Sequence, residues 1–320
     1  MSEMTALRFV LPTGELAIVT DEGVSGRESR QTVRIDRMGR DPRFFLNSLQ
    51  EMTNNMTDSL FSVADQVVLV SGGSRGIGKA LAKGFADCGA KVIITGREQS
   101  TLDAAAAGIS SGTHPVQARV CDVADTGRIG PVVEDIAAEH GRIDTLLNVA
   151  GVNIRQPTED FTQEQYDFIL DINLRGAFFM AQAVGKQMLA QGSGSIVNID
   201  SLNSDGPLKY VAPYAMSKCG LTGMTRSMAM EWGPKGVRVN GLAPGFILTD
   251  LTQKLWSNPT MKGWGEFNTP LGRLGVPEDL VGTAVFLASP AAGFLTGQTI
   301  YVDGGMVAGR VWPIPRDGGQ

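Results

Sequence analysis

Two side chains that can move a proton, Tyr214 and Lys218, stand four residues apart in the run Tyr-Ala-Met-Ser-Lys. On a helix, positions with that spacing share one face. A tyrosine hydroxyl is a poor base at neutral pH, but a neighbouring lysine cation stabilises the phenolate and lowers the pKa of the tyrosine. Such a tyrosine can pass a proton to or from a substrate oxygen. The same spacing is also common on solvated helix faces, which is the alternative interpretation.

Two further polar residues support a site of this kind. Ser201 follows an apolar run at 195–199, so its hydroxyl can bind the same substrate oxygen as Tyr214. Asn173 falls inside a helical pattern although asparagine is a poor helix former. This placement indicates a polar role for Asn173, such as holding a water.

A glycine-rich segment has the composition of a phosphate-binding turn. It follows an apolar run at 67–71, leads into a helical pattern, and includes Ser71, Gly72, Ser74, Arg75, Gly76, Ile77 and Gly78. Such a turn exposes backbone N–H groups at the positive end of a helix, where phosphate oxygens bind. The spacing G-x-x-x-G-x-G differs from the more common G-x-G-x-x-G. We predict a dinucleotide cofactor here; an ordinary strand-to-helix turn is the alternative.

Two arginines favour one nicotinamide cofactor over the other. The second strand pattern ends Thr-Gly-Arg at 95–97, where an NAD site usually has an acidic residue for the ribose hydroxyls. Arg97 and Arg75 can instead bind a 2′-phosphate, which a carboxylate would repel. We therefore expect NADP(H) in preference to NAD(H). The alternative is that Arg97 is only a solvated residue at a helix start.

The third and fourth strand patterns also end in residues suited to the cofactor. Asp122 and Val123 follow the run 116–121, and Asp122 can accept a hydrogen bond from an adenine amino group or cap a turn. Asn148, Ala150 and Gly151 close the fourth pattern. The small residues there allow an adenosine ribose to approach, and Asn148 can tie neighbouring strands together.

The elements that must position these residues alternate along the chain. Apolar, β-branched runs typical of buried parallel strands lie at 67–71, 91–95, 116–121, 145–149, 195–199, 237–242 and 298–302. Helical patterns between them include 76–88, 126–140, 163–191, 214–232 and 277–288. The alternation predicts one doubly wound α/β domain, with a parallel seven-stranded sheet and helices on both faces. The carboxyl ends of the strands then meet at one rim.

Composition excludes several classes of protein. The net charge of −5 opposes binding to a nucleic-acid backbone, and the apolar fraction of 42% excludes a disordered chain. Three dispersed cysteines and two histidines give neither a disulfide framework nor a metal site, which fits a cytoplasmic protein. No apolar run is long enough to cross a bilayer, so we expect no membrane partner.

The first 60 residues differ from the rest. They contain seven arginines and no lysine, with acidic residues interleaved. We interpret 1–60 as a solvated or loosely attached extension, 61–307 as the α/β domain and 308–320 as a C-terminal tail. A mitochondrial transit peptide would be poor in acidic residues. A natural start at Met52 or Met56 is a further alternative.

Together the motifs resemble those of the short-chain dehydrogenase/reductase family over about residues 60 to 307. The resemblance implies a Rossmann fold and a catalytic tetrad of Asn173, Ser201, Tyr214 and Lys218. In that tetrad Tyr214 is the acid/base, Ser201 binds the substrate oxygen, Lys218 also holds the nicotinamide ribose, and Asn173 anchors a water. Val149 stands where the family more often has a second asparagine, and residues 1–60 lie outside the family pattern.

The resemblance also assigns residues to the cofactor. Those that would line the pyrophosphate or contact the nicotinamide carboxamide and diphosphate are Gly72, Gly76, Gly78, Pro244, Gly245, Ile247 and Thr249.

The family transfers a hydride between a nicotinamide and a carbonyl or alcohol carbon, and its members form homo-oligomers, tetramers or dimers. Within it, the chain is most similar to the gluconate 5-dehydrogenase branch, which acts on sugar acids and polyols. The 3-oxoacyl-carrier-protein reductase branch is the alternative. A non-catalytic NADP(H)-binding sensor is a third hypothesis, although such proteins typically lose the tyrosine or the lysine.

The substrate is expected to meet the segment 248–273. Its aromatic side chains suit a sugar ring or acyl chain and its cations suit an acid. The side chains in question are Lys254, Trp256, Trp264 and Arg273. Arg155 can pair with an acidic substrate or with Glu159, and Asn203 and Lys209 can point polar groups inward.

Overall fold

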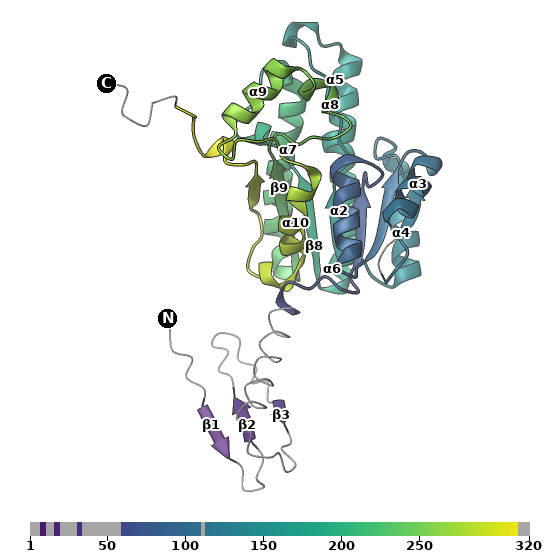
Figure 1. Cartoon of the computed structure of the whole chain (residues 1–320). Helices are drawn as coiled ribbons and strands as arrows, with labels where there is room; N and C mark the ends of the chain where they lie inside the picture. Colours follow the sequence, from purple (N-terminus) through teal and green to yellow (C-terminus); the bar gives the residue numbers. More distant parts are fainter. Residues whose placement is uncertain (1–6, 11–15, 20–30, 34–58, 110–112, 313–320) are drawn as a thin grey trace, which may run out of the picture. The chain divides into compact units, whose positions relative to one another are not determined.

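The computed structural model of the chain describes residues 7–10, 16–19, 31–33, 59–109 and 113–312. The chain divides into two compact units, Met1–Met56 and Thr57–Gln320. The second unit contains the predicted α/β domain (Figure 1).

A parallel sheet of seven strands forms the centre of the larger unit, as the sequence predicts. The strands lie in the order β10-β9-β8-β7-β4-β5-β6. They are β4 (Val67–Ser71), β5 (Lys91–Gly96), β6 (Gln117–Val120), β7 (Thr145–Asn148), β8 (Gly194–Ile199), β9 (Val237–Pro244) and β10 (Thr299–Val302). Each lies within three residues of its predicted bounds.

Helices cover both faces of this sheet (Figure 1). The described α-helices of this unit are α2 (Gly76–Asp87), α3 (Gln99–Ile109), α4 (Thr126–His140), α5 (Gln163–Leu170), α6 (Ala177–Gln191), α7 (Ala212–Trp232), α8 (Gln253–Trp256), α9 (Pro259–Asn268) and α10 (Val281–Ala288). Of these, α5, α8 and α9 lie beyond one end of the sheet (Figure 1). Short helical turns are η1 (Thr158–Asp160), η2 (Asp171–Gly176), η3 (Leu202–Ser204), η4 (Gly233–Lys235), η5 (Pro277–Leu280), η6 (Pro290–Ala292) and η7 (Met306–Ala308).

The apolar runs are continuous because both faces of each strand are buried. Successive side chains of β4 point to opposite faces. Val68 and Val70 pack with α2, α3 and α10 in one core, whereas Val67 and Leu69 pack with α4, α6 and α7 in another. All four are at most 2% exposed. The rigid sheet between these cores holds the strand ends in fixed positions.

The prediction of one continuous helix at 163–191 is wrong. The structure has α5, a π-helical turn η2, and then α6. A π turn takes in one extra residue and is frequent at functional sites. Here it contains Asn173, whose amide is held by the backbone of Val152, and Gly176, where a Cβ would lie 2.6 Å from the Val123 carbonyl oxygen. These two contacts account for the interrupted helix.

Two other predicted helices also differ. The segment 277–288 begins as the 3₁₀ turn η5, and α7 begins two residues before Tyr214 with Pro213 in its first turn. A proline there is favourable, since its missing N–H would have no partner inside the helix.

In the smaller unit, β1 (Leu7–Val10), β2 (Leu16–Val19) and β3 (Gln31–Val33) form an antiparallel sheet in that order. The sequence pattern of residues 1–60 does not predict these strands. The alternative starts Met52 and Met56 lie outside the described residues.

Among the residues that the structure describes, no helix is both long and apolar enough to cross a membrane.

The turn that leads into β9 depends on a glycine, Gly236, and can be tested by substituting it. Gly236 has φ of +81°, and a Cβ there would lie 2.2 Å from the Gly192 carbonyl oxygen. We expect Gly236→Ala to lower the free energy of unfolding by about 2 kcal/mol or more, because both the left-handed backbone and the close approach exclude a side chain. The measurement is denaturant unfolding.

The matched control is Gly223→Ala on α7, where nothing lies within 4 Å of the added Cβ. It should leave stability unchanged or raise it by up to about 1 kcal/mol. Equal losses in the two variants would contradict this account of the turn.

Candidate active site

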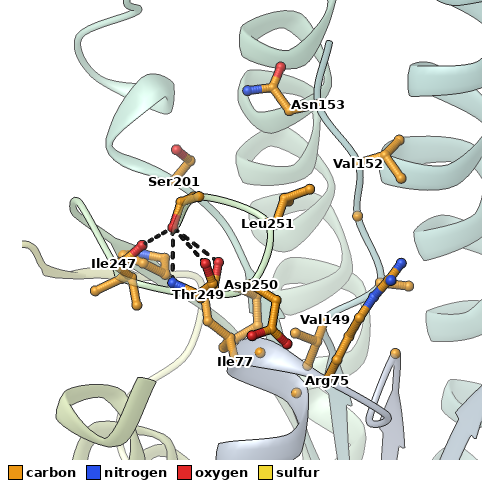
Figure 2. Close-up of a pocket in the computed structure, with 18 of the residues that line it drawn as sticks. Arg75, Ile77, Val149, Val152, Asn153, Ser201, Ile247, Thr249, Asp250 and Leu251 are labelled. Atoms are coloured by element: carbon orange, nitrogen blue, oxygen red, sulfur yellow. Dashed lines mark hydrogen bonds between the residues drawn. The ribbon is translucent and has the colours of Figure 1, made fainter. Parts of the chain in front are cut away.

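A cleft lies where the strand order of the sheet reverses. β4 and β7 are neighbours, and the chain continues from β4 to β5 on one side and from β7 to β8 on the other. Ligands of open parallel sheets bind at this point. The cleft has a volume of about 330 Å³, and Figure 2 shows Ser201 and Asn153 on one part of its wall and Arg75 and Ile77 on another.

Most residues that the sequence predicts for the cofactor line this cleft. They are Gly72, Ser74, Arg75, Gly76, Ile77, Gly78, Arg97, Asp122, Val123, Ala150, Gly151, Tyr214, Lys218, Pro244, Gly245, Ile247 and Thr249.

The glycine-rich turn is built so that backbone can face a ligand. Gly72 has φ of +83°, and a Cβ there would lie 2.8 Å from the backbone of Ala150. A Cβ at Gly78 would lie 2.0 Å from the Gly72 carbonyl oxygen. Both positions therefore exclude side chains. The turn leads directly into the N-terminus of α2, where unpaired N–H groups carry partial positive charge.

Two exposed guanidinium groups stand at the same end of the cleft. Arg75 precedes α2 and Arg97 follows β5, and the described residues provide no ion pair for either. Asp122 lies nearby and accepts a hydrogen bond of 3.0 Å from the Ala124 N–H. That bond matches the turn-capping alternative for Asp122, which still lines the cleft.

Ser71 and Asn148 lie behind the wall of the cleft rather than on it. Both are buried at strand ends, and the Ser71 hydroxyl has no hydrogen-bond partner among the described residues. The Asn148 amide donates to the Ala177 carbonyl and to Asn198 on β8, at 2.8 and 3.2 Å. Asn148 thus links β7 to β8 and to α6.

Tyr214 and Lys218 both reach the cleft from α7. Lys218 is 4% exposed, and its ammonium donates a hydrogen bond of 2.6 Å to the Ile199 carbonyl at the end of β8. Its Nζ lies 5.7 Å from the centre of the Tyr214 ring. The predicted proximity of phenol and ammonium is therefore present, and both groups face the space beside the glycine-rich turn.

The Ser201 hydroxyl accepts two hydrogen bonds within the protein, which leaves its hydrogen free to be donated to a ligand. Its Oγ accepts hydrogen bonds from the backbone N–H and the side-chain amide of Asn203, each at 3.1 Å. A hydroxyl has one donor and two acceptor positions, so the Ser201 O–H can donate to a ligand. Asn203, predicted to point into the site, instead orients Ser201.

Asn173 does not line the cleft. Its Oδ1 accepts from the Val152 N–H at 2.8 Å, and its Nδ2 donates to the Val152 carbonyl and to Ser217 on α7 at 2.9 and 3.1 Å. It therefore ties η2 to the segment after β7 and to the turn that carries Tyr214. Its role in holding a water stays a prediction.

The loop after β9 closes one side of the cleft through Thr252, a residue that the sequence analysis missed. Its hydroxyl donates to the Ile247 carbonyl at 2.6 Å and accepts from the Thr249 N–H at 2.9 Å. Figure 2 shows these bonds as dashed lines beside Asp250 and Leu251. They fold the loop back on itself and fix Thr249 beside the glycine-rich turn, where an added Cβ at Gly76 would lie 3.6 Å from the Thr249 side chain.

The predicted substrate residues of 248–273 lie elsewhere. Arg273 forms a bidentate ion pair with Asp279, at 2.7 and 2.8 Å, which lowers the pKa of that carboxyl to about 2. Trp256 is buried against Phe246 in a third apolar cluster. Neither these two nor Lys254 and Trp264 line the cleft. The stretch that does line it is 249–252.

The segment after β7 supplies polar groups instead. Asn153 and Arg155 line the cleft, and the Asn153 Oδ1 is buried with no hydrogen-bond partner in the described part of the chain. Arg155 is exposed, and the described residues contain no ion pair between it and Glu159. The Arg155 guanidinium is therefore available to a polar ligand in the cleft, whereas Lys209 lies over the ring of Tyr210.

Asp200 is a second residue that sequence reasoning missed. It lines the cleft between Ile199 and Ser201 and is 2% exposed. Burial raises the pKa of its carboxyl, opposed by hydrogen bonds from Ser204 and Thr222 and by the charge of Lys218. An acidic residue directly after a buried strand was the available signal.

In the described part of the chain, no group of three or more acidic, histidine or cysteine side chains is arranged to hold a metal ion.

Comparison with known proteins places this geometry in a family. A family model described as enoyl-(acyl carrier protein) reductase matches residues 72–307. Gluconate 5-dehydrogenase of Gluconobacter oxydans is 40% identical over 247 residues, covering 77% of this chain and 96% of that protein. 3-Oxoacyl-[acyl-carrier-protein] reductase of Synechocystis is 40% identical over 244 residues, covering 76% and 97%.

A solved structure agrees with these relatives. The gluconate 5-dehydrogenase of Burkholderia cenocepacia, in complex with NADP and tartrate, is 35% identical with a TM-score of 0.77, covering 79% of this chain and 99% of that one. The chain is therefore an oxidoreductase that acts on CH–OH groups, and it belongs to the short-chain dehydrogenase/reductase family.

Proposed function

We propose that the chain is an NADP(H)-dependent oxidoreductase that interconverts a secondary alcohol and a carbonyl on a sugar acid or polyol, in the manner of a gluconate 5-dehydrogenase. The observation that carries the proposal is one cleft lined by Tyr214, Ser201 and Lys218 at one end and by a glycine-rich turn with two arginines at the other. Proton-transfer groups and an anion-binding cradle thus share one space.

The cradle fits a dinucleotide phosphate. Gly72 and Gly78 exclude side chains, so backbone N–H groups at the start of α2 can meet a pyrophosphate. The guanidinium groups of Arg75 and Arg97 suit a 2′-phosphate, with no carboxylate at the end of β5 to repel it. These features support NADP(H) over NAD(H).

The chain's own residues supply the rest of the chemistry. Bound NADPH provides the hydride that reduces the carbonyl carbon. The Ser201 hydroxyl donates a hydrogen bond to the carbonyl oxygen, and the Tyr214 hydroxyl gives that oxygen its proton. The Lys218 ammonium, held by the Ile199 carbonyl, stabilises the phenolate that Tyr214 becomes. Oxidation runs through the same groups in reverse.

Arg155 supports an acidic substrate. Arg155 lines the cleft and is exposed, so its guanidinium can bind a substrate carboxylate. A second candidate, reduction of a 3-oxoacyl thioester, is supported by the Synechocystis relative. The exposed Arg155 in the lining of the cleft favours the sugar acid.

We further propose a cytoplasmic homo-oligomer, a dimer or tetramer, with residues 1–60 as an extension and 308–320 as a tail. Large apolar side chains exposed on α6 and α7, namely Phe178, Met216 and Met230, support association of subunits. The three free cysteines support a reducing compartment.

The substrate proposal is tested with a panel of carbonyls. We expect NADPH oxidation with 5-ketogluconate, and Arg155→Ala should raise the KM for this acid by about 10- to 100-fold, the loss expected for one hydrogen bond to a charged group. The KM for a neutral keto-polyol should change less than threefold. Steady-state absorbance of the reduced nicotinamide is the measurement.

Turnover of acetoacetyl thioester alone would move the protein to the acyl-reductase class. Equal effects of Arg155→Ala on acidic and neutral substrates would remove the carboxylate contact.

The acid/base assignment predicts that Tyr214→Phe lowers kcat by about 10² to 10⁴-fold, the usual contribution of one general acid. The dissociation constant for NADPH, measured by fluorescence titration, should stay within threefold of wild type. A Tyr214→Phe protein with wild-type turnover would contradict the mechanism.

The cofactor preference predicts that Arg97→Asp weakens NADPH binding by about 10- to 100-fold, because a charge-assisted bond becomes a repulsion. NADH binding should change little. Calorimetric titration of both cofactors is the measurement, and equal weakening of the two would show that Arg97 does not contact a 2′-phosphate.

A further inference from the structure

Asp200 occupies the position between two groups of the active site. Ile199, before it, gives its carbonyl to the Lys218 ammonium, and Ser201, after it, carries the hydroxyl that faces the substrate. The Asp200 backbone is fixed as well, since its N–H donates to the Leu242 carbonyl of β9 at 2.8 Å. Its side chain is 2% exposed and has no place in the proton transfer described above.

The carboxylate collects donors from two segments. On the loop side, Oδ1 accepts from the Ser201 N–H at 3.0 Å and from the Ser204 hydroxyl at the end of η3. On the helix side, Oδ2 accepts from the Thr222 hydroxyl on α7 at 2.5 Å. Thr222 lies one turn after Lys218, and its hydroxyl also lies 3.3 Å from the Lys218 carbonyl. One side chain therefore joins the loop of Ser201 to the helix of Tyr214 and Lys218.

We propose that Asp200 is a positioning residue, whose ionised carboxylate clamps the Ser201 loop to the Lys218 turn of α7 and so sets the separation of the two hydroxyls that hold the substrate oxygen. The proposal rests on the proposed function in that its kinetic readout is carbonyl reduction. An ionised carboxylate suits this clamp because it has acceptor positions for all three donors and no donor of its own. An amide in its place must turn one N–H toward a hydroxyl.

Titratable groups near the clamp come from α7 and β10. The Lys218 ammonium of α7 favours the ionised Asp200 carboxyl. The pKa of Tyr301 on β10 is raised by burial and then by the charges of Asp205 and Asp200, and Arg226 of α7 opposes that rise. Burial dominates, so the pKa of Asp200 lies above the usual carboxyl range. Lowering the pH through that pKa gives the carboxyl a proton and converts one acceptor into a donor. Because this pKa is raised, the clamp weakens at a higher pH than it would if the pKa of Asp200 were that of an exposed aspartate.

A matched pair at Thr222 tests the clamp. Thr222→Val keeps the shape but removes the hydroxyl, whereas Thr222→Ser keeps the hydroxyl. We expect Thr222→Val to lower kcat about tenfold with NADPH binding unchanged, because a misplaced group near the reacting atoms slows the chemistry. Thr222→Ser should stay within twofold of wild type. Wild-type kcat in Thr222→Val, or an equal loss in Thr222→Ser, would overturn the proposal.

The pH profile separates a clamp from a merely structural contact. Wild-type kcat for reduction should fall on the acid side, as Asp200 takes up its proton, toward the lower rate of Asp200→Asn. The isosteric Asp200→Asn should show no such acid step. Parallel profiles for the two proteins would contradict the role of the ionised carboxylate.

A readout without substrate keeps this test apart from the proposed function. If the wild type reduces no carbonyl in the panel, the proposed function is wrong. The clamp is then tested without substrate, by comparing crystal structures of the wild type and Thr222→Val, each with NADP⁺. The clamp predicts that η3 moves away from α7, with Ser201 Oγ farther from Lys218 Nζ in the variant. An unchanged Ser201 position would overturn it.

Discussion

Burial of the Lys218 ammonium is the constraint on which the site depends. An ammonium taken out of water costs several kcal/mol unless it is hydrogen-bonded and its charge is compensated. Lys218 is 4% exposed and donates to the carbonyl of the last residue of β8. This contact docks α7 at the carboxyl end of the sheet. Because Tyr214 lies one turn earlier on the same helix, docking the lysine also delivers the phenol to the cleft.

The two ends of the cleft are built differently. The end proposed for the cofactor belongs to the rigid frame, because the turn after β4 packs on the backbone that follows β7. The end proposed for the substrate belongs to packed loops, where Leu202, next to Ser201, shares an apolar cluster with Phe246, Trp256 and Leu274. The cluster couples the position of Ser201 to the loop after β9. A general hydride-transfer frame can therefore carry different substrates through changes in these loops.

The sequence predicted the frame because strand period, glycine spacing and apolar runs are local signals. The seven strands and the lining by Gly72, Tyr214 and Arg97 follow from such patterns. What sequence missed depends on tertiary contacts. The π turn at Asn173 reflects bonds to Val152, and the burial of Trp256 reflects packing on Phe246. No periodicity of the sequence predicts either contact. The contacts of Asp200 with Ser204 and Thr222 could not be predicted for the same reason, because they join a loop to α7.

The proposed reaction requires a nicotinamide, the Tyr214 hydroxyl and a substrate carbonyl to meet in one cleft. A crystal structure of the protein with NADP⁺ and gluconate shows whether they do. We expect the reacting oxygen within hydrogen-bond distance, about 3 Å, of both the Ser201 and Tyr214 hydroxyls, with the substrate carboxylate toward Arg155. Gluconate bound away from Tyr214, or a cofactor whose nicotinamide lies outside this cleft, would contradict it.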